Sequence, residues 1–139
     1  MIRVVLDVNT LASAALNEQG LPAHVTNLAF AGALELSVSN HIIEKLAEVF
    51  DRPYFVRNVP ERERDRILRA LMKNLPPIDP DETVRGIAPD LEDDLVLGTA
   101  VAAEADFLVT GDKGLLAIGE YHGVRIITAA EFLDELTRE

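Results

Sequence analysis

The stretch that decides the fold is "IRVVLDVNT" at residues 2–10, in which an apolar run ends abruptly in a carboxylate. The run at residues 4–6 is typical of a strand that is buried on both faces. Asp7 follows it directly, and a helix-like stretch comes next. Ligand sites of parallel α/β sheets lie beyond the carboxyl ends of the strands. Asp7 therefore either caps the next helix or belongs to such a site.

Strand-like runs alternate with helical segments along the whole chain. Further strands are predicted at residues 34–39, 106–112 and 124–128. Helices are predicted at residues 21–34, 40–50, 60–75, 91–105, 113–119 and 129–139, with Asn40 and Thr128 as N-caps. The Pro-rich residues 76–90 are expected to cross the surface with one short edge strand. The alternation predicts an α/β fold, with one domain over residues 1–139 and a central parallel sheet that carries helices on both faces.

The composition narrows the class of protein. The 139-residue chain is 48% hydrophobic, which is enough for a core, and it contains no cysteine. The missing thiols exclude a disulfide scaffold, a thiolate metal site and a cysteine nucleophile. The first apolar run is too short for a signal peptide, and no apolar run reaches the roughly 18 residues needed to span a membrane. A cytoplasmic protein without a membrane partner is the expectation.

Charge is unevenly distributed along the chain. The net charge of −11 argues against a nucleic-acid partner for the protein as a whole. Between residues 45 and 73, however, eight basic residues outnumber five acidic ones. This basic segment is either a solvated helix with i,i+4 ion pairs or a surface for an anionic ligand, and both interpretations stay open.

Acidic residues gather at the predicted ligand edge of the sheet. Asp7 follows the first strand and Asp112 follows "FLVTG", so their carboxylates lie close together if these strands are neighbours. Like charges at close range raise each other's pKa, and a hard cation such as Mg²⁺ or Mn²⁺ removes that cost. The alternative is that each aspartate only caps the helix that follows it.

Helical periodicity indicates which way three further acidic side chains face. Asp93 shares a helix face with Leu97, but periodicity does not separate it from its neighbour Asp94. Glu44 lies nearly opposite the apolar stripe of its own helix. Periodicity alone therefore places Glu44 at the surface.

Three stretches together resemble a known family. They are "VVLDVNTLASAAL", "LSVSNHIIEKLAEVFDRPYF" and the run from "PDLEDDLVLGTAVAAEADFLVTGD" to "GVRIITAAEFL", which cover most of the chain in the family's order. The chain resembles PIN domains, and closely the VapC-like toxins of toxin–antitoxin pairs. PIN domains are metal-dependent ribonucleases with acidic residues around Mg²⁺ or Mn²⁺. The resemblance therefore implies an endoribonuclease in which a metal-activated water hydrolyses a phosphodiester bond.

The resemblance also implies a set of site residues. By position in the family pattern, the catalytic and metal-binding acids are Asp7, Glu44, Asp93 and Asp112. The implied role of Glu44 conflicts with its placement at the surface by periodicity. Of the two neighbouring aspartates on the helix at residues 91–105, the family pattern selects Asp93 and not Asp94. Polar positions that would support the acids are Asn9, Ser39 and Thr110. The basic segment would contact RNA phosphates through Arg52, Arg57, Arg62, Arg66 and Arg69.

Two positions depart from the toxin subgroup. Gly114 stands where an acid is common, and Leu95 stands where a lysine is common. The first departure removes an outer carboxylate, and the second removes a positive charge near the substrate path. The partners that the resemblance implies are an RNA substrate, a small antitoxin protein and a second copy of the chain in a homodimer.

Three other functions stay open on the sequence. The motif "DVNT" is similar to the nucleophile motif of haloacid-dehalogenase-type phosphatases, but Asn9 replaces the acid that would act on the leaving group. A receiver-like phosphoacceptor needs a pair of acids at its first strand and an acceptor on its central strand, and the first strand offers only Asp7. A PIN-like protein that only binds RNA or a partner would keep the fold without activity. Metal-dependent RNA cleavage separates this last alternative from the ribonuclease hypothesis.

Overall fold

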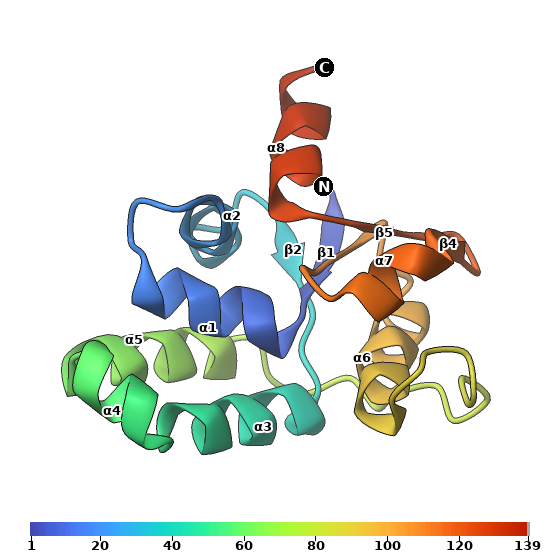
Figure 1. The fold of residues 1–139 in the computed structure, drawn as a ribbon. Coiled ribbons are helices and arrows are strands. Elements are labelled where there is room, and N and C mark those ends of the chain that lie inside the picture. The colour runs from blue at the N-terminus through green and yellow to red at the C-terminus, as the bar shows by residue number, and fades with distance from the viewer. Residues whose placement is uncertain (139) are drawn as a thin grey trace.

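The structure, a computed structural model, describes residues 1–138, and Figure 1 shows their arrangement. The helices are α1 (Val8–Leu16), α2 (Leu21–Phe30), α3 (Asn40–Phe50), α4 (Pro53–Asn58), α5 (Glu61–Met72), α6 (Leu91–Ala102), α7 (Lys113–Ile118) and α8 (Ala129–Thr137). The strands are β1 (Arg3–Leu6), β2 (Glu35–Leu36), β3 (Phe107–Val109), β4 (Glu120–Tyr121) and β5 (Val124–Ile127). The last residue of the predicted helix at 129–139 lies outside the described residues.

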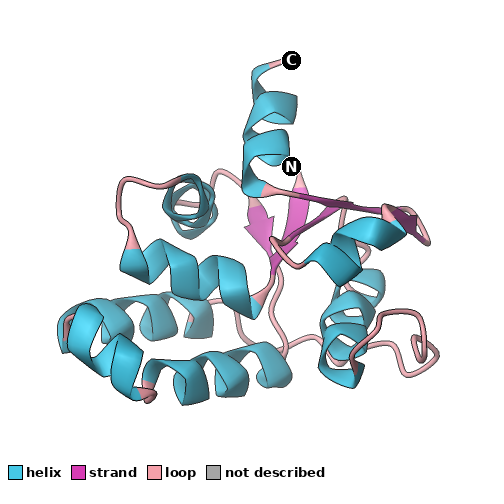
Figure 2. Ribbon diagram, viewed as in Figure 1, coloured by secondary structure: helices cyan, strands magenta, loops and turns pink. Residues whose placement is uncertain are grey.

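The strands form one sheet in the order β2-β1-β3-β5-β4, drawn in magenta in Figure 2. β1 lies between β2 and β3 and runs parallel to both, with Val4 opposite Leu36 and Leu6 opposite Val109. β3 is parallel to β5. The predicted α/β fold, with the first strand and "DFLVTG" as central neighbours, is confirmed. The sequence does not predict β4, which pairs antiparallel with β5, so one edge of the sheet is not parallel.

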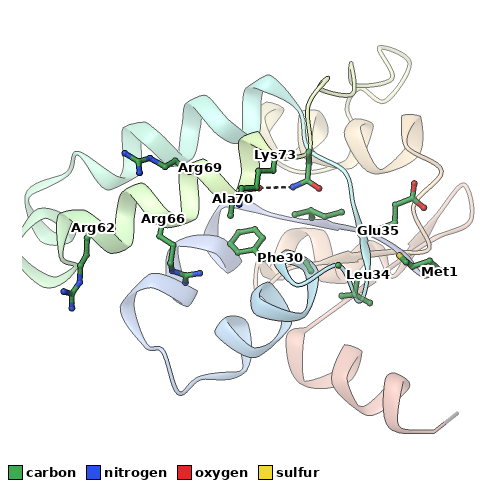
Figure 3. Close-up of a pocket in the computed structure, with 13 residues that line it drawn as sticks. Met1, Phe30, Leu34, Glu35, Arg62, Arg66, Arg69, Ala70 and Lys73 are labelled. Carbon is green, nitrogen blue, oxygen red and sulfur yellow. Dashed lines mark hydrogen bonds between the residues drawn. The ribbon is translucent and has the colours of Figure 1, made fainter.

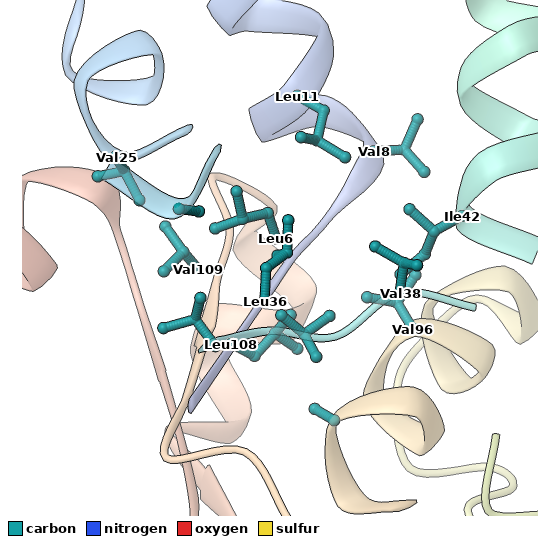
Figure 4. Close-up of a cluster of buried hydrophobic side chains, with 14 of the residues drawn as sticks. Leu6, Val8, Leu11, Val25, Leu36, Val38, Ile42, Val96, Leu108 and Val109 are labelled. Carbon is teal, nitrogen blue, oxygen red and sulfur yellow. The ribbon is translucent and has the colours of Figure 1, made fainter. Parts of the chain in front are cut away.

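Helices cover both faces of the sheet. α6 packs against β1 and β3, and α7 packs against β5. α2 packs against α1 and α8, and Figure 1 shows α1 and α2 on the other side of the sheet from α6 and α7. Apolar side chains from strands and helices meet in the core shown in Figure 4, where Leu11, Ile42 and Leu108 are fully buried. Burial of the apolar side chains of this core supplies the main driving force that holds the sheet against its helices.

The first residues of the helices can be compared with the N-caps predicted from the sequence. Thr128 caps α8 as predicted, in a capping box with Glu131. The prediction that Asn40 caps α3 is wrong by one residue. The hydroxyl oxygen of Ser39 accepts a hydrogen bond from the Ile42 N–H at 3.3 Å, and Asn40 is already the first helical residue. The short helix α4, with Pro53 at its first position, was not predicted from the sequence.

Residues 76–90 form an anchored loop rather than a strand. Within the described chain, the expected edge strand at residues 76–90 is absent. One bond links the loop to the chain after β2, because the Ile78 N–H donates to the Val38 carbonyl at 2.8 Å. The Asp81 N–H donates to the Gly98 carbonyl of α6 at 3.0 Å. A Cβ at residue 98 would lie 3.0 Å from the Asp81 carbonyl oxygen, so glycine permits this close approach. None of the helices among residues 1–138 is both long and apolar enough to cross a membrane.

Candidate active site

Asp7 leaves β1 as a buried residue with fixed hydrogen bonds. Its carboxylate accepts the Thr10 N–H at 2.8 Å and thereby caps α1. It also accepts the hydroxyl of Thr110, which follows β3. Burial raises the pKa of Asp7 above its ordinary value, and these hydrogen bonds oppose that rise only in part. Asp7 is therefore a helix cap, and it is also a carboxylate whose charge is costly to keep without a nearby cation.

Thr110 links the two strand ends. Its hydroxyl oxygen accepts the Asp112 N–H at 3.0 Å while its O–H donates to Asp7. The Asp112 carboxylate in turn caps α7 by accepting the Leu115 N–H at 2.9 Å. Because β1 and β3 are direct neighbours, this short relay holds Asp7 and Asp112 at the same edge of the sheet.

The first turn of α6 separates two adjacent aspartates. Asp93 lines a pocket that Asp7 and Asp112 also line. Asp94 is buried on a different side, where its carboxylate accepts the N–H groups of Gly86 at 2.8 Å and Ala88 at 2.8 Å. The structure thus places Asp93 in the pocket and Asp94 outside it, which agrees with the position that the family pattern selects.

The pocket lies at the carboxyl ends of β1 and β3 and has a volume of about 220 Å³. We call it the acidic pocket, because its carboxylate wall consists of Asp7, Asp90, Glu92, Asp93 and Asp112. Desolvation and the negative charges of Asp112, Asp90 and Asp7 raise the pKa of Asp93 to about 6. The carboxylates are therefore close enough to influence each other's ionisation.

Glu44 does not join this group. It is exposed on α3 and is not among the residues that line the acidic pocket. Its neighbour Lys45 lines the pocket instead, with its Nζ 3.2 Å from Glu92. Ile42 and Leu46 are fully buried and fix the rotation of α3. The exposure of Glu44 agrees with its placement by periodicity, and the site role that the family resemblance implies for it stays a prediction.

The donor set fits a hard divalent cation in an open site. Mg²⁺ and Mn²⁺ prefer oxygen ligands, and Mg²⁺ usually keeps several waters beside one or two carboxylates and substrate phosphates. Asp7, Asp93 and Asp112 supply such oxygens to one pocket. Across residues 1–138, however, no three His, Cys, Asp or Glu side chains converge into a group that could hold an ion by itself. Water and substrate would have to complete the coordination.

The supporting positions have different roles in the structure. Thr110 bridges the two strand-end aspartates, and Asn9 lines the acidic pocket. Ser39 is buried and caps α3. A Cβ at residue 114 would lie 2.9 Å from the Pro89 ring and 3.1 Å from the Asp112 carboxylate, which explains why this chain has Gly114. Leu95 faces the loop at residues 79–85 rather than the acidic pocket, so its position is not on the surface where a substrate would meet the aspartates.

The predicted RNA contacts fall in separate places. Arg52 lines the acidic pocket. Arg62, Arg66 and Arg69 instead line a cavity of about 720 Å³ between α5, β2 and the end of α2, shown in Figure 3. Arg57 lies on α4 and lines neither of the two. Of the five arginines, only Arg52 is placed to contact a ligand in the acidic pocket.

On the basic side of this pocket, Arg52 is a predicted RNA contact, whereas His41 and Lys45 are not predicted from the sequence. His41, Lys45 and Arg52 line it from α3 and the residue before α4. The signal is the spacing of four residues between His41 and Lys45, which places both side chains on one face of α3. Lys45 belongs to the basic segment at residues 45–73, so its pairing with His41 does not stand out in the sequence.

The raised pKa of Asp93 predicts a pH dependence of stability. A folded pKa near 6 against an ordinary value of 3.8 means that the folded state holds this proton more tightly than the unfolded state. The contribution of Asp93 to stability is therefore most favourable below about pH 4, declines as pH rises toward 6, and levels off above it. Urea unfolding with a chelator present should show this decline as the difference between the parent protein and Asp93→Asn. A difference that does not change between pH 4 and 7 would contradict the raised pKa.

Comparisons with known proteins agree with the fold. The family model described as "PIN domain" matches residues 3–114. The fold is similar to that of the crystal structure of PAE2754 from Pyrobaculum aerophilum, with a TM-score of 0.66 and 18% sequence identity over 99% of this chain and 91% of the other. At this identity the likeness concerns the fold alone. No curated protein matches the chain significantly.

Proposed function

Because the chain belongs to the PIN domain family, we propose that it is a metal-dependent endoribonuclease that acts as the toxin of a toxin–antitoxin pair. PIN domains are typically nucleases, which gives the coarse activity. The observation that carries the proposed metal-dependent activity is that Asp7, Asp93 and Asp112 line one pocket at the carboxyl ends of the central strands. The cytoplasm, where RNA is abundant, is the proposed place of action.

The proposed cofactor is Mg²⁺ or Mn²⁺, held by Asp7, Asp93 and Asp112. When bound, such an ion lowers the pKa of a water molecule and offsets the negative charge that develops on a phosphodiester. Thr110 keeps the Asp7 carboxylate in place through its hydroxyl, so one ligand oxygen is positioned before substrate arrives. Asp112 is oriented by its bond to the Leu115 N–H. Asp93, with its pKa raised to about 6, must lose its proton before it binds a cation.

The toxin role and its partners rest on the resemblance of "LVTGDKGLL" and "GVRIITAAEFL" to the toxin subgroup. A small antitoxin and a homodimer are parts of this proposal. The test is to express the chain in a bacterial host, alone and together with the protein encoded by the adjacent reading frame. Growth arrest that requires Asp112 and is relieved by the second protein supports the toxin role. Normal growth together with cleavage of RNA in vitro would leave a ribonuclease without this role.

The activity itself is tested by incubating the purified protein with single-stranded RNA. Cleavage is expected with Mn²⁺ or Mg²⁺ and should stop when a chelator is added. Asp112→Asn serves as the control for a contaminating nuclease. RNA binding without cleavage under all metal conditions would favour the alternative of an inactive PIN-like binding protein.

Glu44 gives a sharper test of which acids form the site. Because Glu44 is exposed and does not line the acidic pocket, we expect Glu44→Gln to cleave RNA within about twofold of the parent. Asp112→Asn should lose at least about a hundredfold, because even the loss of a group that only orients a metal ligand costs roughly 10–100-fold. Initial cleavage rates at saturating Mn²⁺ compare the two. An equal loss in both variants would mean that α3 rotates to bring Glu44 into the site.

A further inference from the structure

The acidic pocket has a second wall of opposite charge. His41, Lys45 and Arg52 line it from α3 and the start of α4, and we call them the basic wall. Asp7, Asp93 and Asp112 line the same pocket from the ends of β1 and β3 and from α6. A ligand in this pocket therefore lies between carboxylates and cationic side chains.

Lys45 is the best placed cation of the basic wall. Its Nζ lies 3.2 Å from the Glu92 carboxylate and 3.4 Å from that of Glu48. Both glutamate side chains are more than half exposed, at 52% and 63%, while the Lys45 side chain is only 23% exposed. Exposed ion pairs of this kind contribute little to stability. Lys45 can therefore exchange a glutamate oxygen for a phosphate oxygen at little cost.

The carboxylate wall alone would repel a polyanion. Five acidic side chains line the pocket, and a single divalent ion does not neutralise them all. A phosphodiester that enters the pocket needs further positive charge on the side facing away from the aspartates. The ammonium group of Lys45 is a compact charge with three donors on a flexible stem, which suits contact with phosphate oxygens.

We propose that Lys45 is a substrate-contacting residue that binds a phosphate of the RNA across the acidic pocket from Asp7, Asp93 and Asp112. This inference rests on the proposed ribonuclease function and adds to it the residue that takes the substrate's charge. Arg52 lines the same wall of the pocket. The lysine thus contributes to substrate affinity, whereas the aspartates contribute to metal binding.

The test compares three variants by RNA binding at several salt concentrations. Lys45→Met keeps the apolar stem and removes the charge, and Lys45→Arg keeps the charge. Arg3→Met is the matched control, because Arg3 also pairs with two surface glutamates, Glu35 at 3.3 Å and Glu104 at 3.5 Å, but at the amino end of β1. Fluorescence anisotropy with a labelled single-stranded RNA, in Ca²⁺ to supply a hard cation, gives the affinity. Thermal melting confirms that each variant is folded.

Lys45→Met should bind RNA about fivefold more weakly at low salt, as expected for the loss of one surface charge contact. The slope of log affinity against log salt should become shallower by about 0.7, the value for one lost phosphate contact on a single strand. Lys45→Arg and Arg3→Met should keep the parent slope. A merely structural lysine would not change the slope.

The outcomes separate this inference from the proposed function. If the parent cleaves RNA with Mn²⁺ and Lys45→Met keeps the parent slope and affinity, the Lys45 inference is overturned and the ribonuclease proposal stands. If the parent neither binds nor cleaves RNA with any of these ions, both are overturned. A shallower slope in Lys45→Met alone supports the phosphate contact.

Discussion

Asp7→Asn should abolish metal-dependent RNA cleavage while leaving the metal-free protein as stable as the parent, or more stable, near neutral pH. The loss of activity follows from replacing a charged oxygen ligand by a neutral amide, and we expect at least about a hundredfold. The stability effect follows from burial. Asp7 is almost fully buried, and its pKa is raised because the charged form is desolvated.

The sign of the pH effect is fixed by that raised pKa. The folded state binds the Asp7 proton more tightly than the unfolded state, so the parent loses stability as pH rises through the folded pKa. The asparagine of the variant has no charge to bury and escapes this loss. Its side-chain carbonyl can still accept the Thr10 N–H that caps α1, and its amide can donate to the hydroxyl oxygen of Thr110. The fold therefore keeps its local hydrogen bonds.

Melting curves with a chelator and with Mn²⁺, run beside a cleavage assay on single-stranded RNA, measure both effects. Mn²⁺ should raise the melting temperature of the parent, because binding to the folded state stabilises it, and should raise that of Asp7→Asn much less. Asp7→Ala is the control for the cap, and it should lose about 1 kcal/mol or more through the missing acceptor. If Asp7→Asn cleaves RNA like the parent, Asp7 is only a helix cap.

The strand ends were predictable because they depend on local pattern. An apolar run that stops at Asp7 marks the end of a buried strand in any parallel sheet, and the same holds for the run before Asp112. Once these strands are neighbours, their carboxyl ends must meet. The choice of Asp93 over Asp94 depends on the family resemblance, because helical periodicity alone does not separate these two neighbours.

The basic wall was not predictable in the same way. Family resemblance assigns a role to a position along the chain, whereas function depends on the direction of the side chain. Glu44 and Lys45 are adjacent, and a shift of one residue turns a side chain by about 100° around the helix axis. Burial of Ile42 and Leu46 fixes this rotation, and the apolar stripe of the helix therefore predicts that Glu44 is exposed. Arginines on α5 are separated from the pocket because α5 packs against α1 and α3, and no local pattern describes this packing.

Asp94→Asn should lower the free energy of unfolding by about 2–3 kcal/mol, in contrast to Asp93→Asn. Asp94 is 4% exposed and its carboxylate accepts three backbone N–H groups, from Gly86 at 2.8 Å, Ile87 at 3.2 Å and Ala88 at 2.8 Å. An amide in its place would turn a donor toward at least one of these N–H groups. The charge-assisted hydrogen bonds from these N–H groups would be weakened, and at least one part-buried donor would be left without a partner. Together these losses account for the expected drop of about 2–3 kcal/mol.

Asp93→Asn should have the opposite effects on stability and on RNA cleavage. Asp93→Asn removes a repelled carboxylate from the acidic pocket, so its metal-free stability near neutral pH should equal or exceed that of the parent while its cleavage activity is lost. Asp94→Asn should keep cleavage at a temperature well below its own melting transition, because Asp94 does not line the pocket. Urea unfolding of both variants, with cleavage rates measured where both are fully folded, separates the two roles. Loss of activity in folded Asp94→Asn, together with normal activity in Asp93→Asn, would exchange the assignments and place the metal site on the loop side of α6.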